Sequence, residues 1–285
     1  MAAAVTTLTN AAILKQTYTS DFALAPTEEA VVADFINQPF GTERIGNKLY
    51  FRKIKAVNAG KWTSGVSGLS AGLAAVASTA NTEEAPSTTL AYAFGMLELD
   101  EPALTRLVDD GNYRNGIRKQ LAAAVNATVD TDAFALAASF SHTESGAAVN
   151  DTMYMSAIGQ LSTYAKNKFK VGETEARLFV HPTQVKNALA IEAAREYRIR
   201  GSAGSAVSGA LMSPYGLVVR ESGNVYNNGA NYFNVIITKD AWGIGYNIKP
   251  SPLPEQQDGI VTRLIFRAEY GLLTQFDECG VALLT

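Results

Sequence analysis

Few residues of the kinds that most often carry chemistry occur in this sequence, and their spacing does not assemble them into a site. The two histidines, His142 and His181, lie far apart and have no cysteine or carboxylate neighbours at the spacing of metal ligands. His142 lies in a polar stretch and His181 beside a proline, so we expect both to be surface or structural residues. The sequence therefore predicts no zinc site and no catalytic histidine.

The single cysteine, Cys279, is the remaining candidate for a strong nucleophile. No partner base is evident for it in the sequence, and a small packing residue near the carboxyl end is the favoured interpretation. One cysteine also excludes an internal disulfide and points to folding in a reducing compartment.

Paired carboxylates and a glycine motif are the last candidates. The acidic pairs are Glu28-Glu29, Glu83-Glu84, Asp109-Asp110 and Asp277-Glu278. Adjacent side chains point to opposite faces of a strand, or roughly 100° apart on a helix, so solvated faces explain these pairs. Gly243-Ile244-Gly245 lacks the third glycine and the following helix of a dinucleotide-binding loop. The sequence therefore predicts a protein that is not an enzyme, with no catalytic residue, no cofactor and no metal.

One run of charge stands out, because six basic residues and no acidic one lie from position 44 to position 61, interleaved with Tyr50, Phe51 and Trp62. The basic residues are Arg44, Lys48, Arg52, Lys53, Lys55 and Lys61. Such interleaving can bind nucleic acid. The favoured interpretation is docking on an acidic surface of a neighbouring copy, and a solvated strand face is the third. The candidate acidic residues are Asp100, Glu101, Asp109 and Asp110.

Composition limits the class of protein. The 285 residues allow one large or two modest domains. Hydrophobic residues make up 47% and charged residues 18%, which suits a chain that buries much of its surface against copies of itself. A net charge of -3 provides no overall basic field for nucleic acid as a primary ligand. With no apolar run near membrane-spanning length and no signal-peptide pattern, we expect a soluble chain made in the cytoplasm.

The longest helical pattern runs from Asp100 to about Phe140. Asp100 is placed to cap its amino end, and Glu101 complements the helix dipole there. The apolar residues of this run fall on one broad face, which must pack against a sheet or another helix. We call this predicted helix the spine.

The apolar face of the spine has two interruptions. Arg114 and Arg118 break the apolar stripe, and Gly111 and Gly116 predict a bend or break between them, since each glycine costs roughly 1 kcal/mol in a helix. If a second copy covers the spine, the two arginines become candidate intersubunit contacts.

The segments before the spine read as an arm and a hairpin. We expect an extended arm over 1–40 with a short helix at about 27–36, a strand at 47–57, a glycine-rich mobile tip at 59–80 and a second strand at 88–99. Alternation places Leu90, Tyr92, Phe94 and Met96 on one face of the second strand. A hairpin of this length cannot bury its own face, so it must fold back or lie on a neighbour.

The segments after the spine predict a mixed lobe. We expect a polar loop at 141–151, helices at 151–168 and 182–194, a flexible loop at 201–209, strands at 215–220, 232–238 and 241–246, and final strands at 259–268, 270–276 and 281–284. Asn150 or Asp151 is expected to cap the first of these helices. Pro250, Pro252 and Pro254 predict a stiff connector without regular structure.

Four local stretches carry a resemblance to a known family. They are Leu178-Phe179-Val180-His181-Pro182-Thr183-Gln184, the run from Leu211 to Val219, the run from Thr238 to Tyr246, and Glu269-Tyr270-Gly271-Leu272. With the order of the predicted elements, the chain resembles the major capsid proteins of tailed bacteriophages, which have the Hong Kong 97-like fold. The resemblance covers nearly the whole chain, and none of the stretches is an active-site signature.

The resemblance implies an α+β fold divided into an amino-terminal arm (1–46), an extended β-hairpin loop (47–99), a peripheral domain with the spine helix (100–181), an axial domain (182–250) and return strands to the peripheral domain (251–285). It implies a shell subunit that forms the hexamers and pentamers of an icosahedral head around double-stranded DNA, in the virion after assembly in the host cytoplasm. Gly201, Gly204 and Gly209 would then line a loop at the capsomer axis.

The implied partners are other copies, a separate scaffolding protein, a portal, non-specifically bound DNA and, in some heads, a decoration protein, with no membrane. Candidate intersubunit contacts are the six basic residues above, Trp62, the four acidic residues above, Arg114 and Arg118. Lys61 is the obvious position for an intersubunit crosslink, although no partner motif is visible. The alternative is an encapsulin-type nanocompartment shell that encloses protein cargo, and the third class is a cytoplasmic α/β enzyme.

Overall fold

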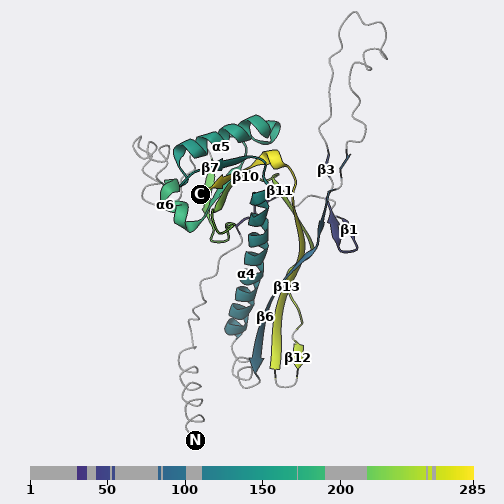
Figure 1. Ribbon diagram of the computed structural model, residues 1–285. Coiled ribbons are helices and arrows are strands. Elements are labelled where there is room, and N and C mark those ends of the chain that lie inside the picture. Colours follow the sequence, from purple (N-terminus) through teal and green to yellow (C-terminus); the bar gives the residue numbers. More distant parts are fainter. Residues whose placement is uncertain are drawn as a thin grey trace, which may run out of the picture. The chain divides into compact units, whose positions relative to one another are not determined.

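The computed structural model describes residues 31–36, 43–51, 53–54, 83–84, 86–100, 111–171, 173–189, 217–254, 256–258 and 261–285 (Figure 1). The chain divides into two compact units. The first includes Ala93–Thr128 and Pro250–Ala268, and the second comprises Ala30–Tyr92, Val129–Lys249 and Glu269–Thr285. The expectations for the arm before residue 31, the hairpin tip at 59–80, the spine start at 101–110 and the loop at 201–209 lie outside the described residues.

A five-stranded sheet forms the centre of the second unit, in the order β7-β14-β10-β8-β9. Its strands are β7 (Thr143–Ser145), β8 (Ala176–Val180), β9 (Val218–Glu221), β10 (Phe233–Thr238) and β14 (Gly280–Leu284). The central strand β10 is antiparallel to β14 and to β8, while the outer pairs β14–β7 and β8–β9 are parallel. All six residues of β10 are buried, as its continuous apolar run predicts for a strand covered on both faces.

Aromatic side chains fill the space beside this sheet. The ring of Phe134 lies 5.6 Å from Phe179 and 6.4 Å from Trp242, both edge to face, and Phe140 stacks on Trp242 at 5.5 Å. Gly280 lies against Phe140, since a Cβ there would be 2.1 Å from its ring. This cluster joins the end of the spine helix to the sheet.

Two helices of the second unit begin where the sequence predicts. Asn150 caps helix α5 (Asp151–Tyr164) by accepting the Met153 N–H at 2.9 Å, and α5 packs on β14 and β7. The side of α5 that faces the sheet is apolar, because Tyr154, Ile158 and Leu161 are buried. Helix α6 (Pro182–Leu189) begins at the proline that suits its first turn.

The base of the hairpin is a second, smaller sheet of the same unit, with the order β1-β2-β5. Its strands are β1 (Glu43–Ile45), β2 (Lys48–Tyr50) and β5 (Ser87–Thr89), and beyond it β3 (Lys53–Ile54) pairs with β4 (Glu83–Glu84). The strand predicted at 47–57 is therefore confirmed by β2 and β3, and the strand predicted at 88–99 begins with β5. Strand β1 was not predicted, and it reaches β2 through a tight turn at Gly46, whose φ of 64° favours glycine.

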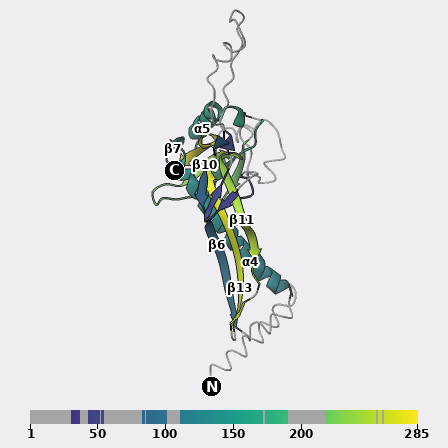
Figure 2. The same cartoon turned by 90° about the vertical axis from the view of Figure 1, so that its right-hand side faces the viewer.

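The remaining strands form a sheet in which β13 (Val261–Thr274) is the hub. It pairs with β11 (Trp242–Pro252), β12 (Gln256–Asp258) and β6 (Ala91–Asp100), and Figure 2 shows the long strands running beside one another. Helix α4 (Gly111–Ala135) belongs to the first unit up to Thr128, and there it lies beside β6, because a Cβ on Gly95 would meet the Leu121 Cδ2 at 3.3 Å.

The predicted spine needs two corrections. Asp100 does not cap a helix, because it is the last residue of β6, so strand pairing overrides the local cap signal. The expected break between Gly111 and Gly116 is absent, since α4 is helical from Gly111 through Gly116 to Ala135, where a 3₁₀ turn follows. Gly116 is buried, which indicates that packing offsets its low helix propensity.

The proline-rich connector was also wrongly predicted. Strand β11 continues through Pro250 and Pro252, and the Leu253 N–H still donates to the Ile265 oxygen at 2.8 Å. Among the described strands, β11 pairs only with β13, so it is an edge strand. A proline is tolerated on an edge because its missing N–H can face outwards without costing a ladder bond.

Three smaller expectations change as well. The polar loop at 141–151 contains β7, a short edge strand whose pairing with β14 is remote in sequence. Residues 31–36 form a turn rather than a helix, with Val32 accepting the N–H groups of Phe35 and Ile36. The two strands expected on either side of Glu269 are one continuous strand, β13.

Candidate functional site

The hairpin strands meet β13 at a tightly packed contact. Leu49, Phe51 and Leu90 form a buried cluster, and Leu273 packs against it. A Cβ on Gly271 would lie 2.6 Å from the Thr88 Cγ2 and 3.3 Å from the Leu49 Cβ. Glycine is therefore needed at position 271 for β2 and β5 to approach β13 this closely.

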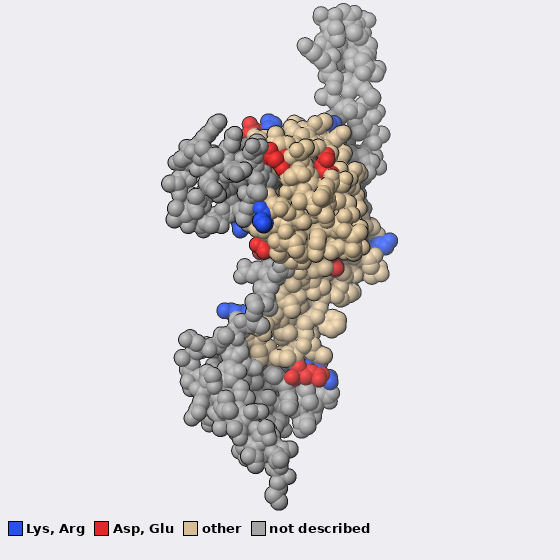
Figure 3. Space-filling view, turned by 60° about the vertical axis from the view of Figure 1, so that its left-hand side comes forward, with Lys and Arg blue, Asp and Glu red and all other residues tan. Residues whose placement is uncertain are grey.

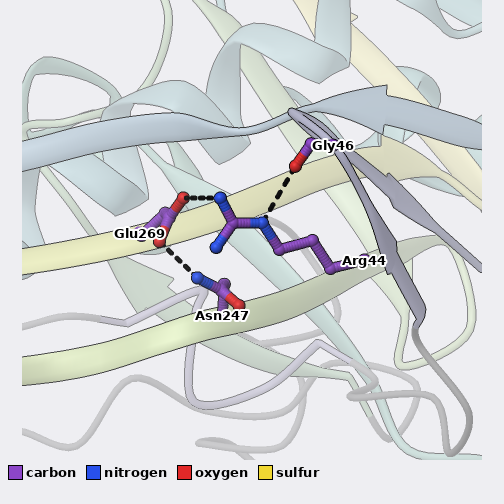
Figure 4. Close-up of polar contacts among 4 residues, drawn as sticks. All are labelled: Arg44, Gly46, Asn247 and Glu269. Carbon is purple, nitrogen blue, oxygen red and sulfur yellow. Dashed lines mark hydrogen bonds and ion pairs between the residues drawn. The ribbon is translucent and has the colours of Figure 1, made fainter.

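A buried carboxylate holds the same base by charge (Figure 4). The Arg44 Nη2 lies 3.6 Å from the Glu269 Oε1, and the Arg44 Nε donates to the Gly46 oxygen at 2.9 Å. The Asn247 amide donates to the other carboxylate oxygen, and the Tyr92 hydroxyl also hydrogen-bonds Glu269, which raises the pKa of Tyr92. Because Glu269 is buried, these partners offset the cost of removing its charge from water.

A second buried carboxylate holds the turn at 31–36. Asp130 of α4 accepts three backbone N–H groups, from Val31 at 2.5 Å, Val32 at 3.3 Å and Ala33 at 2.9 Å. Burial raises the pKa of Asp130 above its ordinary value, and the three hydrogen bonds oppose that shift. The turn is therefore fixed to α4 through its backbone, whatever its side chains are.

Phe35 fixes the same turn through its side chain. Its ring lies 6.0 Å from the Phe179 ring, and the guanidinium of Arg177 lies 4.2 Å from its centroid. Glu175 pairs with Arg177 at 2.7 Å and with Lys239 at 2.6 Å, and these partners lower the pKa of Glu175. The turn at 31–36 is thus anchored at two places within the second unit.

The structure places only some of the predicted intersubunit contacts. Arg44 is half-exposed but already paired with Glu269, while Lys48 and Arg118 are exposed. Lys53, Asp100 and Arg114 lie in β3, β6 and α4, but their side chains are outside the described set. Also outside the described residues are Arg52, Lys55, Lys61, Trp62, Glu101, Asp109, Asp110, Gly201, Gly204 and Gly209. The docking of the basic run on the acidic residues therefore stays a prediction.

Sequence reasoning missed Glu269 and Asp130, although a signal for each exists. Glu269 lies in an apolar run of β13, and Asp130 follows Val129 on the buried side of α4. A carboxylate on the side of a helix or strand that faces the core needs hydrogen-bond donors or cations from elsewhere in the chain. The pattern indicates that partners exist, but it does not say which residues they are.

The described residues do not form a recognisable catalytic or metal-binding site. Among them no group of three histidine, cysteine or acidic residues could hold a metal ion. His142 stacks on Tyr164 at 4.1 Å and His181 on Tyr232 at 4.0 Å, as in structural histidines. Burial raises the pKa of the Cys279 thiol to about 11, which disfavours the thiolate. No helix in the described parts of the chain is long and apolar enough to cross a membrane.

No protein-family model and no curated protein matches the chain. Solved structures do match. The capsid of cyanophage P-SCSP1u is similar over 94% of this chain and 91% of its own, with a TM-score of 0.65 and 14% identity. The capsid of Ralstonia phage GP4 has a TM-score of 0.65 and 11% identity over 94% of both chains. A chain of Mycobacterium phage Che8 has a TM-score of 0.64 and 15% identity over 93% of this chain and 95% of its own.

These likenesses extend over nearly the full length of both partners in each comparison. Identity between 11% and 15% is low, so the agreement lies in the path of the chain rather than in its residues. The chain therefore has the fold of phage capsid proteins, and the predicted α+β, Hong Kong 97-like fold is confirmed.

Proposed function

We propose that this chain is the major capsid subunit of a tailed-phage head, a structural protein that assembles into the hexamers and pentamers of an icosahedral shell. One observation carries the proposal: capsid proteins match the chain over 94% of its length, so the likeness is not confined to one common motif. The stacked histidines and the buried Cys279 agree with a structural role. In this function the protein resides in the virion and encloses double-stranded DNA.

The packed hairpin base supports a mechanical role within that function. Gly271 and the Arg44–Glu269 pair hold β1, β2 and β5 to β13, so the base is a fixed pivot for the loop that extends from it. We assign the arm to 1–46, the loop to 47–99, the peripheral domain to 100–181 with return strands from 251, and the axial domain to 182–250. In each shell position the loop and arm would change angle while the base stays constant.

The partners follow from the shell. Other copies are the principal partner, and Lys48 and Arg118 are among the exposed members of the proposed contact set whose side chains the structure describes. DNA would be enclosed in the head without sequence preference and held only weakly by the subunit, because the chain's net charge of -3 gives no overall basic field. A separate scaffolding protein, a portal and a decoration protein complete the proposed set.

The nanocompartment alternative receives no support from the neighbours named above, which are phage proteins. The contents of the particle separate the two functions. A phage shell can hold DNA that it protects from added nuclease, whereas a nanocompartment holds a folded protein cargo.

Electron microscopy of the purified protein tests the proposal directly. We expect rings of five and six subunits, or closed shells, whose number rises with protein concentration and with a crowding agent. A monodisperse monomer or dimer under all these conditions would contradict a capsid subunit. A shell that co-purifies with one enzyme and no DNA would instead support the nanocompartment.

A further inference from the structure

The dipeptide Asn-Gly occurs in two different settings in this chain. Asn115 and Gly116 lie within helix α4, whereas Asn228 and Gly229 lie in the loop between β9 and β10. An asparagine amide before glycine is open to attack by the next backbone nitrogen, because glycine has no side chain to obstruct the approach. The two pairs therefore have the same chemistry and differ in conformation.

Water reaches the pair in the loop. Asn228 and Gly229 are exposed, and so are Asn227 and Ala230 on either side of them. Gly116 is buried inside α4, where a backbone N–H donates to the carbonyl four residues earlier. An attack by a backbone nitrogen needs solvent to remove its proton, so the exposed loop permits a reaction that the helix hinders.

Hydrogen bonds turn the Asn228 side chain across the peptide that would attack it. Its Oδ1 accepts the Ala230 N–H at 3.0 Å and the Asn231 N–H at 2.8 Å, both beyond Gly229 in the chain. Two N–H donors on a carbonyl oxygen withdraw electrons from its carbon and stabilise the negative charge that forms when a nucleophile adds there. The backbone of the loop thus supplies an oxyanion hole for the Asn228 amide.

We propose that Asn228 is a site of spontaneous deamidation. The backbone nitrogen of Gly229 loses its proton to hydroxide and forms a bond to the Asn228 Cγ. The bond from Cγ to Nδ2 then breaks, and ammonia leaves with a proton taken from water. Water adds to either carbonyl carbon of the resulting succinimide ring and opens it, which gives aspartate or isoaspartate at position 228. No oxidant, reductant or cofactor takes part in these steps.

Asn227 restrains the attacking nitrogen. Its Oδ1 accepts the Gly229 N–H at 2.7 Å. A side-chain amide oxygen is a hydrogen-bond acceptor but too weak a base to remove that proton. The hydrogen bond must therefore open before hydroxide reaches the Gly229 N–H, so Asn227 slows the reaction.

Isoaspartate would disturb contacts outside the loop, because it adds a carbon atom to the main chain. Asn227 and Tyr232 form an antiparallel bridge across the loop. Tyr232 also exchanges two backbone hydrogen bonds with Thr285, at 2.9 Å and 3.1 Å, and its ring stacks on His181 at 4.0 Å. A longer main chain between the bridged residues would shift Tyr232 against these partners.

Either product also adds a carboxylate to an uncharged stretch. No charged residue occurs between Glu221 and Lys239. Much of the described surface in Figure 3 is likewise uncharged, with its charges scattered. The modified chain therefore differs from the parent in charge, and ion exchange separates the two.

Peptide mapping by mass spectrometry tests the site in the full chain. Folded protein is aged at neutral and mildly alkaline pH, and conversion is followed at Asn228 and Asn115. We expect Asn228 to convert at least about tenfold faster, since α4 must open before Asn115 can react. In denaturant the two rates should be similar. Equal rates in the folded protein, or an Asn228 that stays intact while the unfolded chain reacts, would overturn the proposal.

Labelled water and a pair of variants test the mechanism. In water with a heavy oxygen isotope, each converted Asn228 should gain one labelled oxygen, and both aspartate and isoaspartate should form. Asn227→Ala should accelerate conversion by about threefold or more, because the Gly229 N–H loses its acceptor. Asn231→Ala is the matched control, since it keeps the backbone N–H that Asn228 accepts. Aspartate as the only product would show direct hydrolysis and overturn the attack by Gly229.

Discussion

Strands β10 and β6 are both rich in apolar residues, yet they bury them differently. Strand β10 has strand partners on both sides and is buried at all six positions, whereas β6 pairs only with β13 among the described strands and closes one face. On β6 the closed face holds Ala93 and Gly95, and the open face holds Tyr92, Phe94 and Met96. The comparison shows that the size of an apolar side chain does not decide whether it enters the core, because a closely packed helix requires small residues opposite it.

The largest effect should come from deleting one phenylalanine in each region. Phe179 of β8 is fully buried between Phe35 and Phe134, so Phe179→Ala should lower the free energy of unfolding by about 3–5 kcal/mol. Phe94→Ala removes the same atoms from an exposed position and should change it by no more than about 0.5 kcal/mol. Urea unfolding of assembly-free protein measures both. Equal losses would mean that the two strands are not distinguished by burial.

The second largest effect on stability should come from replacing one glycine by alanine in the five-stranded sheet and one in β6. Gly280 of β14 has no space for a Cβ, which would lie 2.1 Å from the Phe140 ring, so we expect Gly280→Ala to cost about 3 kcal/mol. A Cβ at Gly95 is tight only against the end of the flexible Leu121 side chain, at 3.3 Å, and its other neighbours lie at ordinary contact distances of 3.5 Å or more, so Gly95→Ala should cost less than about 1 kcal/mol. Thermal unfolding compares them, and a larger loss at Gly95 would contradict the tight packing of the closed sheet.

A buried polar contact should have the third largest effect. It is the contact between Asp130 and the backbone of the turn at 31–36. Asp130→Asn should cost about 2 kcal/mol, because its amide nitrogen would face a backbone N–H that now donates to a carboxylate oxygen. Amide hydrogen exchange at Val32 and Ala33 should accelerate in the variant. Asp34→Asn, on the exposed side of the same turn, is the control and should leave exchange unchanged. Unaltered exchange in Asp130→Asn would refute the anchor.

The smallest effect should come from the surface ion pairs beside Phe35. The pKa of Glu175 is lowered by Lys239 and Arg177, so its contribution is present above the unfolded pKa and disappears as the pH falls through the folded value. Glu175→Gln should cost at most about 1 kcal/mol at neutral pH, since exposed pairs are screened by water. Urea unfolding at neutral and acidic pH should show the difference from wild type vanish in acid. A difference that persists in acid would contradict the ionic origin.

The sequence predicts the elements of the second unit well, because local signals there agree with packing. Asn150 at the start of α5, Pro182 at the start of α6 and the apolar run of β10 were each read from chemistry that acts within a few residues. Prediction failed where remote pairing decided the outcome. Asp100 has the chemistry of a helix cap but ends a strand, and Pro250 lies within β11 because that strand is on an edge.

The candidate site was less accessible to prediction. The basic run was recognised from composition, and Arg44 within it proved to bind Glu269, a residue more than two hundred positions away. Asp130 was likewise unnoticed, because its three donors are backbone groups of a turn remote in sequence. A side-chain type signals a need for a partner, and only the folded chain supplies the partner.

By itself the sequence determined the strand-to-helix transitions and the spacing of Tyr92, Phe94 and Met96 on one face of β6, since these depend on neighbours along the chain, while the class of fold came from a resemblance to a known family. Tertiary structure alone decided which face of β6 is covered, where Glu269 and Asp130 find their donors, and why Gly271 and Gly280 must be glycine. The physical reason is distance along the chain. Burial and close approach are properties of segments that meet only after folding, and no local pattern encodes which segments those are.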